Sequence, residues 1–379
     1  MDVPRIDKGL DDIYVKETSI CFVDGQRGRL LYRGYDIGDL AEHSTFEETA
    51  FVLLRGRLPN RDELDRIRAD LGAARIVPAH VLAFLRRMPK DAAPMDVLRT
   101  AVSLLGAYDP DRGDASRETN LRRAIRLLGA TATIVAAYHR IRTGARVVKP
   151  DPARGQAEDF LRMVTGTRAR AREARVMDVA LILYADHSMN ASTFAATVAA
   201  STLSDLTSSV VAAIAALKGP LHGGAIEAAF DALRSIGRPE AAEAYVLDIL
   251  QNRGKVFGFG HRVYKTYDPR ALIFQRIAKE LSESAGETDL YRIADIVQET
   301  VVRELRSKQI YPNVDFYSGL VFHLLRLPPD LATAIFAMSR TAGWAAHVIE
   351  YWEDNRILRP LDRYVGPTDA VYVRLEDRP

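Results

Sequence analysis

Apolar residues recur every three or four positions along most of the chain, which is the spacing of amphipathic helices. The exception lies near the start, where the apolar runs 20–23 and 29–32 flank the turn residues 24–28 and predict a β-hairpin. An all-α fold with one small N-terminal β-hairpin is therefore expected. After the hairpin, the pattern predicts helices over residues 79–87, 95–105, 117–142, 157–161, 174–185, 225–236, 239–252, 269–281, 289–308, 316–325, 329–338 and 342–352.

Local start and stop signals add two helices to this series. Ser44 and Glu47 form a capping-box pattern, in which a hydroxyl and a carboxylate three residues apart cap the first helical turn. Gly56 lies near the expected end of that helix. Asn60 and Glu63 repeat the pattern and predict the start of the next helix.

The tract 191–217 is rich in alanine, serine and threonine. It predicts two helices rather than one, because Ser204 and Asp205 offer an N-cap in its middle. Small side chains let helices approach closely, so we expect the tract at the centre of the protein or across a subunit interface. Its polar residues also interrupt the most apolar run of the chain, so no membrane-spanning helix is expected.

The length and charge of the chain bound the possible functions. A chain of 379 residues is longer than a usual single domain, which favours one large domain with a smaller one. Hydrophobic residues make up 47% and charged residues 27%, as in ordinary soluble globular proteins. The 52 lysines and arginines nearly balance the 50 aspartates and glutamates, so the basic excess of a nucleic-acid-binding protein is missing. Any anion site must therefore come from a local concentration of arginine.

Two features bear on the cellular compartment. Cys21 is the only cysteine, which excludes an intramolecular disulfide and a cysteine-based zinc cluster and predicts a small core side chain. Residues 1–5 begin acidic and lack an apolar segment, so no secretory signal is expected. We therefore expect a cytoplasmic protein.

Two glycine-flanked histidines are candidates for chemistry. Residues 254–270 place three glycines within seven positions, which costs backbone entropy and indicates a loop held against a ligand. His261 follows these glycines, beside basic side chains that can hold carboxylates or phosphates; a solvated basic loop is the alternative. His222 is the second candidate, because glycines lie on both sides of it.

Asp315 is the third candidate. It lies between Val314 and Phe316, an apolar setting that would raise the pKa of its carboxyl group and make it a better base. Taken alone, Asp315 fits better as the N-cap of the helix that follows. The remaining histidines, apart from the one at position 187, are expected to be structural or solvated, namely His43, His80, His139, His323 and His347.

Together these segments resemble the citrate synthase family. The motifs are the runs 222–224, 258–265 and 313–319, which occur in the order found in the family: His-Gly-Gly, Gly-Phe-Gly-His-Arg-Val-Tyr-Lys and Asn-Val-Asp-Phe-Tyr-Ser-Gly. The resemblance extends to residues 23–36, 185–192 and 339–344, so it spans nearly the whole chain. Ile226 departs from the pattern, because many members have asparagine at that position.

The resemblance implies an all-α, two-domain citrate synthase fold. Residues 1–222 and 327–379 would form a large helical domain that also makes the dimer, and residues 223–326 would form a small helical domain that closes over the active site. The implied reaction joins the methyl carbon of acetyl-CoA to the ketone of oxaloacetate and hydrolyses the citryl thioester. It gives citrate and CoA, the first step of the tricarboxylic acid cycle, and needs no metal and no permanently bound cofactor.

The resemblance also assigns catalytic roles. Asp315 would be the base that takes a methyl proton, His222 the donor that stabilises the enol oxygen, and His261 the donor that polarises the ketone. The substrate carboxylates would be held by His187, Arg270, Arg340 and Arg359.

Further contacts follow from the same resemblance. Arg359 corresponds to a residue that reaches into the neighbouring subunit's site, which implies a homodimer. Phe336 would line the site, although core packing explains it equally well. Contacts to CoA are expected from Lys255, Lys265, Phe257, Gly258 and Gly260.

Three alternatives stay open. A 2-methylcitrate synthase would use propionyl-CoA with the same three catalytic residues, and one extra methyl group is worth only about 1–3 kcal/mol in an apolar pocket. A metal-dependent hydrolase would need histidines at metal-binding spacing, but neither His-x-x-x-His nor His-Glu-x-x-His occurs. A non-catalytic helical homologue would be expected to lack part of the triad or the arginines, which are all present.

Overall fold

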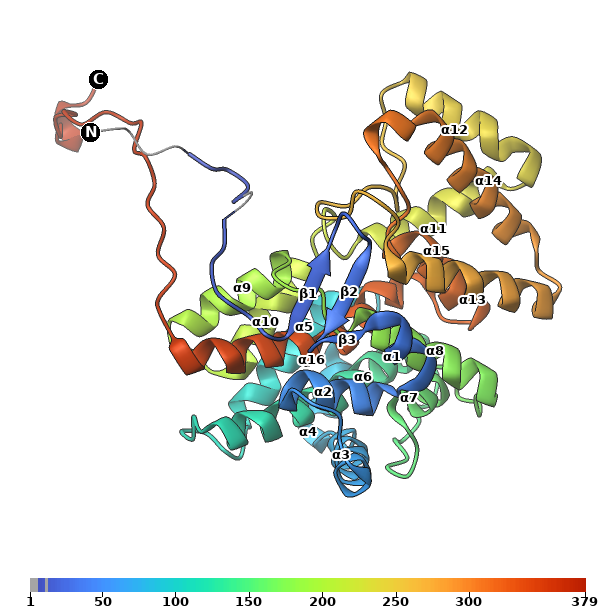
Figure 1. Ribbon diagram of the computed structural model, residues 1–379. Helices are drawn as coiled ribbons and strands as arrows, with labels where there is room; N and C mark the ends of the chain where they lie inside the picture. The colour runs from blue at the N-terminus through green and yellow to red at the C-terminus, as the bar shows by residue number, and fades with distance from the viewer. Residues whose placement is uncertain (1–5, 11–12) are drawn as a thin grey trace.

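The computed structural model describes residues 6–10 and 13–379, so residues 1–5, where no secretory signal is expected, lie outside the described residues. Three short strands precede a succession of helices (Figure 1). The strands are β1 (Cys21–Asp24), β2 (Arg29–Tyr32) and β3 (Tyr35–Asp36).

The helices fall into two spatial groups (Figure 1). The first group contains α1 (Ile37–His43), α2 (Phe46–Arg55), α3 (Arg61–Ala74), α4 (Ala79–Arg87), α5 (Pro94–Ala107), α6 (Arg117–Arg142), α7 (Gln156–Thr165), α8 (Ala171–Tyr184), α9 (Ala191–Ser201), α10 (Leu206–Leu217) and α16 (Ala332–Tyr351). The second contains α11 (Ala225–Ile236), α12 (Ala242–Gln251), α13 (Pro269–Ala285), α14 (Asp289–Glu304) and α15 (Val314–Leu324). Short 3-10 turns are η1 (Pro239–Ala241), η2 (Arg306–Lys308), η3 (Pro329–Leu331), η4 (Trp352–Asp354) and η5 (Leu375–Asp377).

The predicted hairpin is confirmed. Strands β1 and β2 pair antiparallel, with Cys21 opposite Tyr32 and Asp24 opposite Arg29, and β3 adds a third antiparallel strand. The Asp24 carboxylate accepts the N–H of Gln26 at 3.0 Å, which stabilises the turn. Cys21 is buried in the core as expected.

Most helices also lie where the periodicity predicts them, so the all-α prediction is confirmed. The bounds of α4, α6 and α11 agree with the predicted ranges to the residue. The tract 191–217 forms two helices, and the Asp205 side chain caps the second by accepting the Ser208 N–H at 2.9 Å.

The predicted cap of α2 is wrong by one residue. Thr45, not Ser44, is the N-cap, and its hydroxyl accepts the N–H of Glu48 at 3.3 Å. Glu47 does not close a capping box, because its buried carboxylate instead accepts the backbone N–H of Gln156 at 2.6 Å, at the start of α7. Glu47 therefore binds a residue distant in sequence, although the local pattern predicts that it caps α2. The predicted capping box at the start of α3 is confirmed.

The two helices predicted over 329–338 and 342–352 are one continuous helix, α16. The residues between the two predicted ranges, 339–341, are polar, and each is buried with a backbone partner. Ser339 Oγ donates to the carbonyl of Leu181, and Arg340 Nε donates to the carbonyl of Tyr184 at 2.6 Å. Because buried polar groups with hydrogen bonds are tolerated, the helix need not end there.

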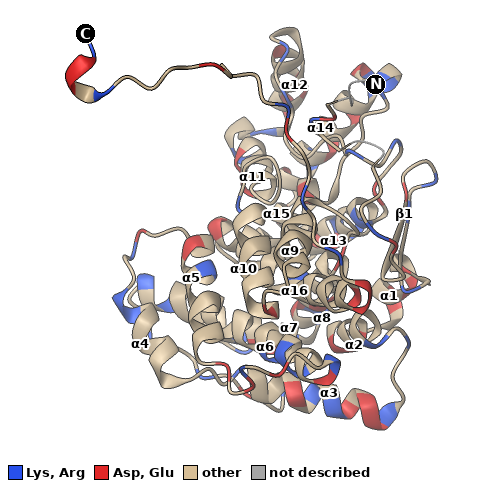
Figure 2. Ribbon diagram, turned by 90° about the vertical axis from the view of Figure 1, so that its left-hand side faces the viewer, with Lys and Arg blue, Asp and Glu red and all other residues tan. Residues whose placement is uncertain are grey.

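Helix α16 lies at the centre of the first group. It packs against α6, α9, α10, α2 and α8, and nearly all of its residues are buried. Charged residues gather on outer helices such as α3, whereas α9 and α10 carry none (Figure 2). Both helices of the small-residue tract pack against the central helix α16, which is one of the two locations expected for the tract. Among the described residues, no helix is both long and apolar enough to cross a membrane.

A buried ion pair joins the end of α3 to α7, away from the centre. Arg75 Nε lies 3.0 Å from Asp159 Oδ2, and the two side chains are 1% and 0% exposed. Arg75 also donates to Gln156 Oε1 at 3.0 Å, so the guanidinium is well satisfied. Removing one partner of such a pair leaves a buried charge without compensation.

Asp159→Ala should therefore lower the free energy of unfolding by about 3–5 kcal/mol. Urea-induced unfolding followed by circular dichroism would measure the loss. The matched control is Glu118→Ala, which removes the exposed ion pair to Arg55 and should cost far less. Equal losses in both variants would contradict the argument from burial.

Candidate active site

Two loops distant in sequence pair with each other in the second group of helices. Phe259 and Pro312 form an isolated antiparallel bridge, and the Gly260 N–H donates to the carbonyl of Tyr311 at 2.9 Å. Asn313 completes the pairing, because its backbone N–H donates to the carbonyl of Gly258 at 2.9 Å. This pairing brings the glycine-histidine motif beside the segment that carries the candidate aspartate.

Glycine is required at position 258 for two reasons. Its φ is +80°, and a Cβ there would lie 2.9 Å from the Cα of Phe316. Any side chain would therefore push the loop away from α15. The prediction that these glycines permit a close approach agrees with this contact, although the chain itself, and not a ligand, is the neighbour at Gly258.

Asp315 is not the N-cap of α15, the role that its position alone favours. Asn313 is the N-cap, and its side chain accepts the N–H of Asp315 at 2.9 Å. The Asp315 carboxyl is thus left without a capping role. Burial raises its pKa to about 7, and the positive charges of Arg270 and Arg340 only partly oppose this shift. A carboxyl group with such a pKa suits a general base near neutral pH.

The tautomer of His261 is set by its own loop. Its Nδ1 accepts the backbone N–H groups of Val263 at 3.0 Å and Tyr264 at 3.2 Å. Neutral His261 must therefore carry its proton on Nε2. Burial and the neighbouring Arg270 lower the pKa of His261 to about 4, so the ring is neutral at physiological pH and can still donate a hydrogen bond.

His222 lies between α10 and α11 and contacts α9. Its Nε2 is 2.9 Å from Ser192 Oγ, which also accepts the indole N–H of Trp344 at 3.1 Å. Burial and the charge of Arg340 lower the pKa of His222 to about 4. The Nδ1 end of the ring is the end directed away from Ser192.

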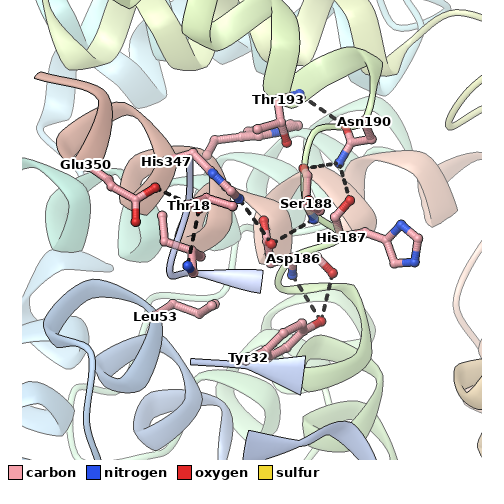
Figure 3. A network of polar contacts seen from close by, with 12 residues as sticks. Thr18, Tyr32, Leu53, Asp186, His187, Ser188, Asn190, Thr193, His347 and Glu350 are labelled. Atoms are coloured by element: carbon pink, nitrogen blue, oxygen red, sulfur yellow. Dashed lines mark hydrogen bonds and ion pairs between the residues drawn. The ribbon is translucent and has the colours of Figure 1, made fainter. Parts of the chain in front are cut away.

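His187 lies close to His261. The two ring centroids are 5.0 Å apart, and His187 Nε2 is 3.3 Å from the hydroxyl of Tyr264. Burial, with the charge of Arg270, holds the pKa of His187 well below its usual value. The ring projects away from the buried pair formed by Asp186 and His347 (Figure 3).

The two buried arginines differ in what they bind. Arg270 forms a bidentate pair with Asp268, through Nε at 3.0 Å and Nη2 at 2.7 Å, so its fork is already occupied by a protein carboxylate. Arg340 is 1% exposed and has no carboxylate partner among the described residues. Its guanidinium lies 4.5 Å from the ring centre of Phe336. Burial lowers the pKa of Arg340, which an anionic ligand would offset.

The remaining predicted contacts lie apart from this cluster or at its surface. Arg359 is exposed on the extended C-terminal segment, which leaves the body of the chain (Figure 1). Lys255 and Lys265 are exposed on the loop before α13, and Phe257 is 51% exposed there. One chain therefore does not bring Arg359 to the other site residues.

Three residues that contact the predicted site residues were not predicted from the sequence. Tyr264 contacts His187, Asp268 pairs with Arg270, and Ser192 contacts His222. Only Asp268 left a local signal, since an acid two residues before an arginine at a helix start can pair with it. Within the described residues, no three His, Cys, Asp or Glu side chains are grouped as a metal site requires.

Comparisons with known proteins agree with the fold. The family model for the citrate synthase C-terminal domain matches residues 9–361. A citrate synthase of Deinococcus radiodurans is 43% identical over 374 residues, which is 99% of both chains. The chain belongs to the citrate synthase family.

Two further relatives extend the comparison. A citrate/2-methylcitrate synthase of Bacillus subtilis is 39% identical over 360 residues, covering 95% of this chain and 96% of its own. A Thermoplasma acidophilum citrate synthase, solved with carboxymethyl coenzyme A and oxaloacetate, superposes with a TM-score of 0.95 at 38% identity. That alignment covers 99% of this chain and 100% of the other. The citrate synthase fold expected from the sequence is thereby confirmed.

The pKa values of His222 and His261 lead to a test in solution. Both rings should stay neutral at about pH 5.5, because their pKa values are lowered to about 4, whereas an exposed histidine would be mostly protonated. Spectra of ¹⁵N-histidine-labelled protein would report the protonation state, with His222→Gln and His261→Gln used for assignment. A titration midpoint near 6.5 for either ring would contradict the prediction.

Proposed function

We propose that the protein condenses acetyl-CoA with oxaloacetate and hydrolyses the citryl thioester to citrate and CoA. The observation that carries this proposal is the loop pairing that sets His261, neutral and protonated on Nε2, beside the helix start of Asp315. An acid with a pKa of about 7 and a neutral donor are the two groups that the condensation requires.

Asp315 takes a proton from the methyl carbon of acetyl-CoA. Negative charge then develops on the thioester oxygen, and His222 stabilises it by donating a hydrogen bond. Ser192 occupies the Nε2 end of the ring, so the donated proton must lie on Nδ1, which requires the Ser192 hydroxyl to donate to Nε2 and not to Asn190 Oδ1. A donor aimed at developing charge is worth about 2.7–4 kcal/mol.

His261 polarises the ketone of oxaloacetate through Nε2–H. The enol carbon forms the new bond to the ketone carbon, and the ketone oxygen, now an alkoxide, takes up a proton. Water then cleaves the thioester of the citryl-CoA product, which releases CoA and leaves the third carboxylate of citrate. The chemistry needs acid and base groups together with a closed, water-controlled pocket.

The substrate carboxylates bind to cationic groups. Arg340 is the first candidate, because its buried guanidinium lacks a carboxylate partner among the described residues. Arg270 contributes beside Asp268, and His187 adds a neutral donor or acceptor. Arg359 is supplied by the neighbouring subunit of a homodimer.

Exposed apolar residues at the C-terminus support a dimer. Leu361 is 84% exposed, Val365 90% and Tyr372 81%, all on the segment that carries Arg359. Such residues lose solvent contact when a second chain covers them, and that burial stabilises the association. CoA is proposed to bind at the loop before α13, through Lys255, Lys265, Phe257, Gly258 and Gly260.

The two groups of helices correspond to the proposed domains. Residues 1–222 and 327–379 form the large domain, and residues 223–326 form the small domain that closes over the site. The contacts that cross between them include the His187–Tyr264 contact at 3.3 Å and the bond from the Lys265 N–H to the Gly25 carbonyl at 2.9 Å. Closure would exclude water and so protect the thioester of acetyl-CoA from hydrolysis until the condensation has taken place.

Propionyl-CoA is the alternative acyl donor. The Bacillus subtilis relative named citrate/2-methylcitrate synthase supports keeping this alternative. A non-catalytic helical homologue is a remote alternative, because the triad and the arginines are all present. Release of free thiol with oxaloacetate and either thioester tests the proposal, and no release with either would overturn it. Faster turnover with propionyl-CoA would instead assign the 2-methylcitrate reaction.

Asp315→Asn should lower kcat by about 10²–10⁴-fold, because the amide keeps the shape of the side chain but cannot act as a base. The same thiol-release assay measures the loss, and the melting temperature serves as the control for folding. An active Asp315→Asn enzyme would remove Asp315 from the role of base.

The pH profile provides a second test. Asp315 must be ionised to accept a proton, and its pKa is raised to about 7. The ratio kcat/KM for acetyl-CoA should therefore fall about tenfold for each pH unit well below 7. The histidines stay neutral in this range and contribute no change, since their pKa values are lowered to about 4. A profile that stays flat down to about pH 5 would contradict the assignment.

A further inference from the structure

The loop between α8 and α9 directs His187 through its backbone. The loop spans residues 185–190, and the only ring-nitrogen partner of His187 among the described residues is the Tyr264 hydroxyl at 3.3 Å. A single contact of that length orients a ring weakly. The direction of His187 must therefore come from how the loop itself is held.

The loop contains an unfavourable backbone conformation. Ser188 has a φ of +52°, the left-handed region that residues other than glycine seldom adopt. The Asp186 carboxylate stabilises it, because Oδ2 accepts the Ser188 N–H at 2.9 Å and closes a turn around His187 (Figure 3). The side chain of Asp186 thus helps to set the direction of the neighbouring His187.

A fully buried carboxylate cannot stay ionised without partners. His347 on α16 supplies one, since its Nε2 lies 3.2 Å from Asp186 Oδ2 and both side chains are 0% exposed. Burial alone would raise the pKa of Asp186, but His347, Arg340 and the Ser188 N–H lower it to about 2. The Asp186 carboxyl group therefore stays ionised near neutral pH.

Helix α16 is shaped to receive this loop. A Cβ at Gly343 would lie 2.2 Å from Asp186 Oδ1 and 2.5 Å from the carbonyl oxygen of Ala185, so the loop rests directly on the helix backbone. On its other side, the Tyr32 hydroxyl accepts the Asp186 N–H at 3.1 Å and lies 2.8 Å from the Asp186 carbonyl oxygen. Asp186 is held from both sides, by the Tyr32 hydroxyl at its backbone and by His347 at its carboxylate.

We infer that the buried Asp186–His347 pair is a positioning pair for substrate binding, which holds the 185–190 loop so that His187 points at oxaloacetate. The inference rests on the proposed function, because it takes oxaloacetate as the ligand of His187. Neither residue touches the substrate. Their effect passes through the Ser188 turn, and a shift of about 1 Å in such a group can cost on the order of a hundredfold.

The test compares His347→Leu with His347→Gln. Leucine removes the donor, whereas the glutamine amide can still donate to Asp186. His347→Leu should raise the KM and the calorimetric Kd for oxaloacetate by about ten- to a hundredfold, with the KM for acetyl-CoA near the wild-type value. His347→Gln should recover most of the affinity. Asp186→Ala removes the carboxylate that accepts the Ser188 N–H, so it should raise the Kd for oxaloacetate in the same way and provides a second reading if the leucine variant does not fold.

The matched control is Asp159→Asn, which weakens another buried ion pair, to Arg75, remote from the site. It should lower the melting temperature and leave oxaloacetate affinity unchanged. If His347→Leu and Asp186→Ala lower the melting temperature but keep wild-type affinity, as the control does, the pair is merely structural and the inference fails. Wild-type protein that neither binds oxaloacetate nor releases thiol would overturn the proposed function, and this inference with it.

Discussion

A helix buried on every side keeps polar side chains only where each has a partner, and this requirement on α16 determines much of the molecule. Ser339 and Arg340 donate to carbonyls at the end of α8, Gly343 lies against the next residues, and His347 reaches Asp186. All these partners belong to one short stretch, which ends α8 and leads into α9. The hydrogen bonds that make α16 a stable core helix therefore also fix the loop that carries His187. Core and site share one set of contacts.

The other half of the site depends on close approach between two loops. The bridge between Phe259 and Pro312 and the glycine at 258 let the loop of His261 lie against the start of α15. There Asn313 takes the capping role, and the carboxyl group of Asp315 remains available in a poorly solvated position. Asn313, the cap, and Asp315, the proposed base, thus stand two residues apart in one helical turn.

Periodicity and start signals predict most helices and the hairpin, because those features depend on neighbours within one turn. The errors arise where a distant partner intervenes. Glu47 was expected to cap α2 but binds Gln156 instead, and the centre of α16 looked like a break because the carbonyls that satisfy Ser339 and Arg340 lie on another helix. The glycine-histidine and aspartate motifs stand out by composition and by family resemblance. Ser192 and Tyr264, which contact His222 and His187, have no such signal in the sequence. A serine or tyrosine is common in any chain, and these two contacts form only in the folded protein.

The hydrogen bonds of His261 have a consequence for the timing of the chemistry. Its Nδ1 accepts N–H groups two and three residues further along the same loop, so both hydrogen bonds are kept when the loop moves as a unit. Movement between the two groups of helices alters where the Nε2 proton lies, but not which atom holds it. In the proposed mechanism, the Nε2 proton of His261 is therefore in place before the two groups of helices close, and closing requires no exchange of protons with the solvent at this ring.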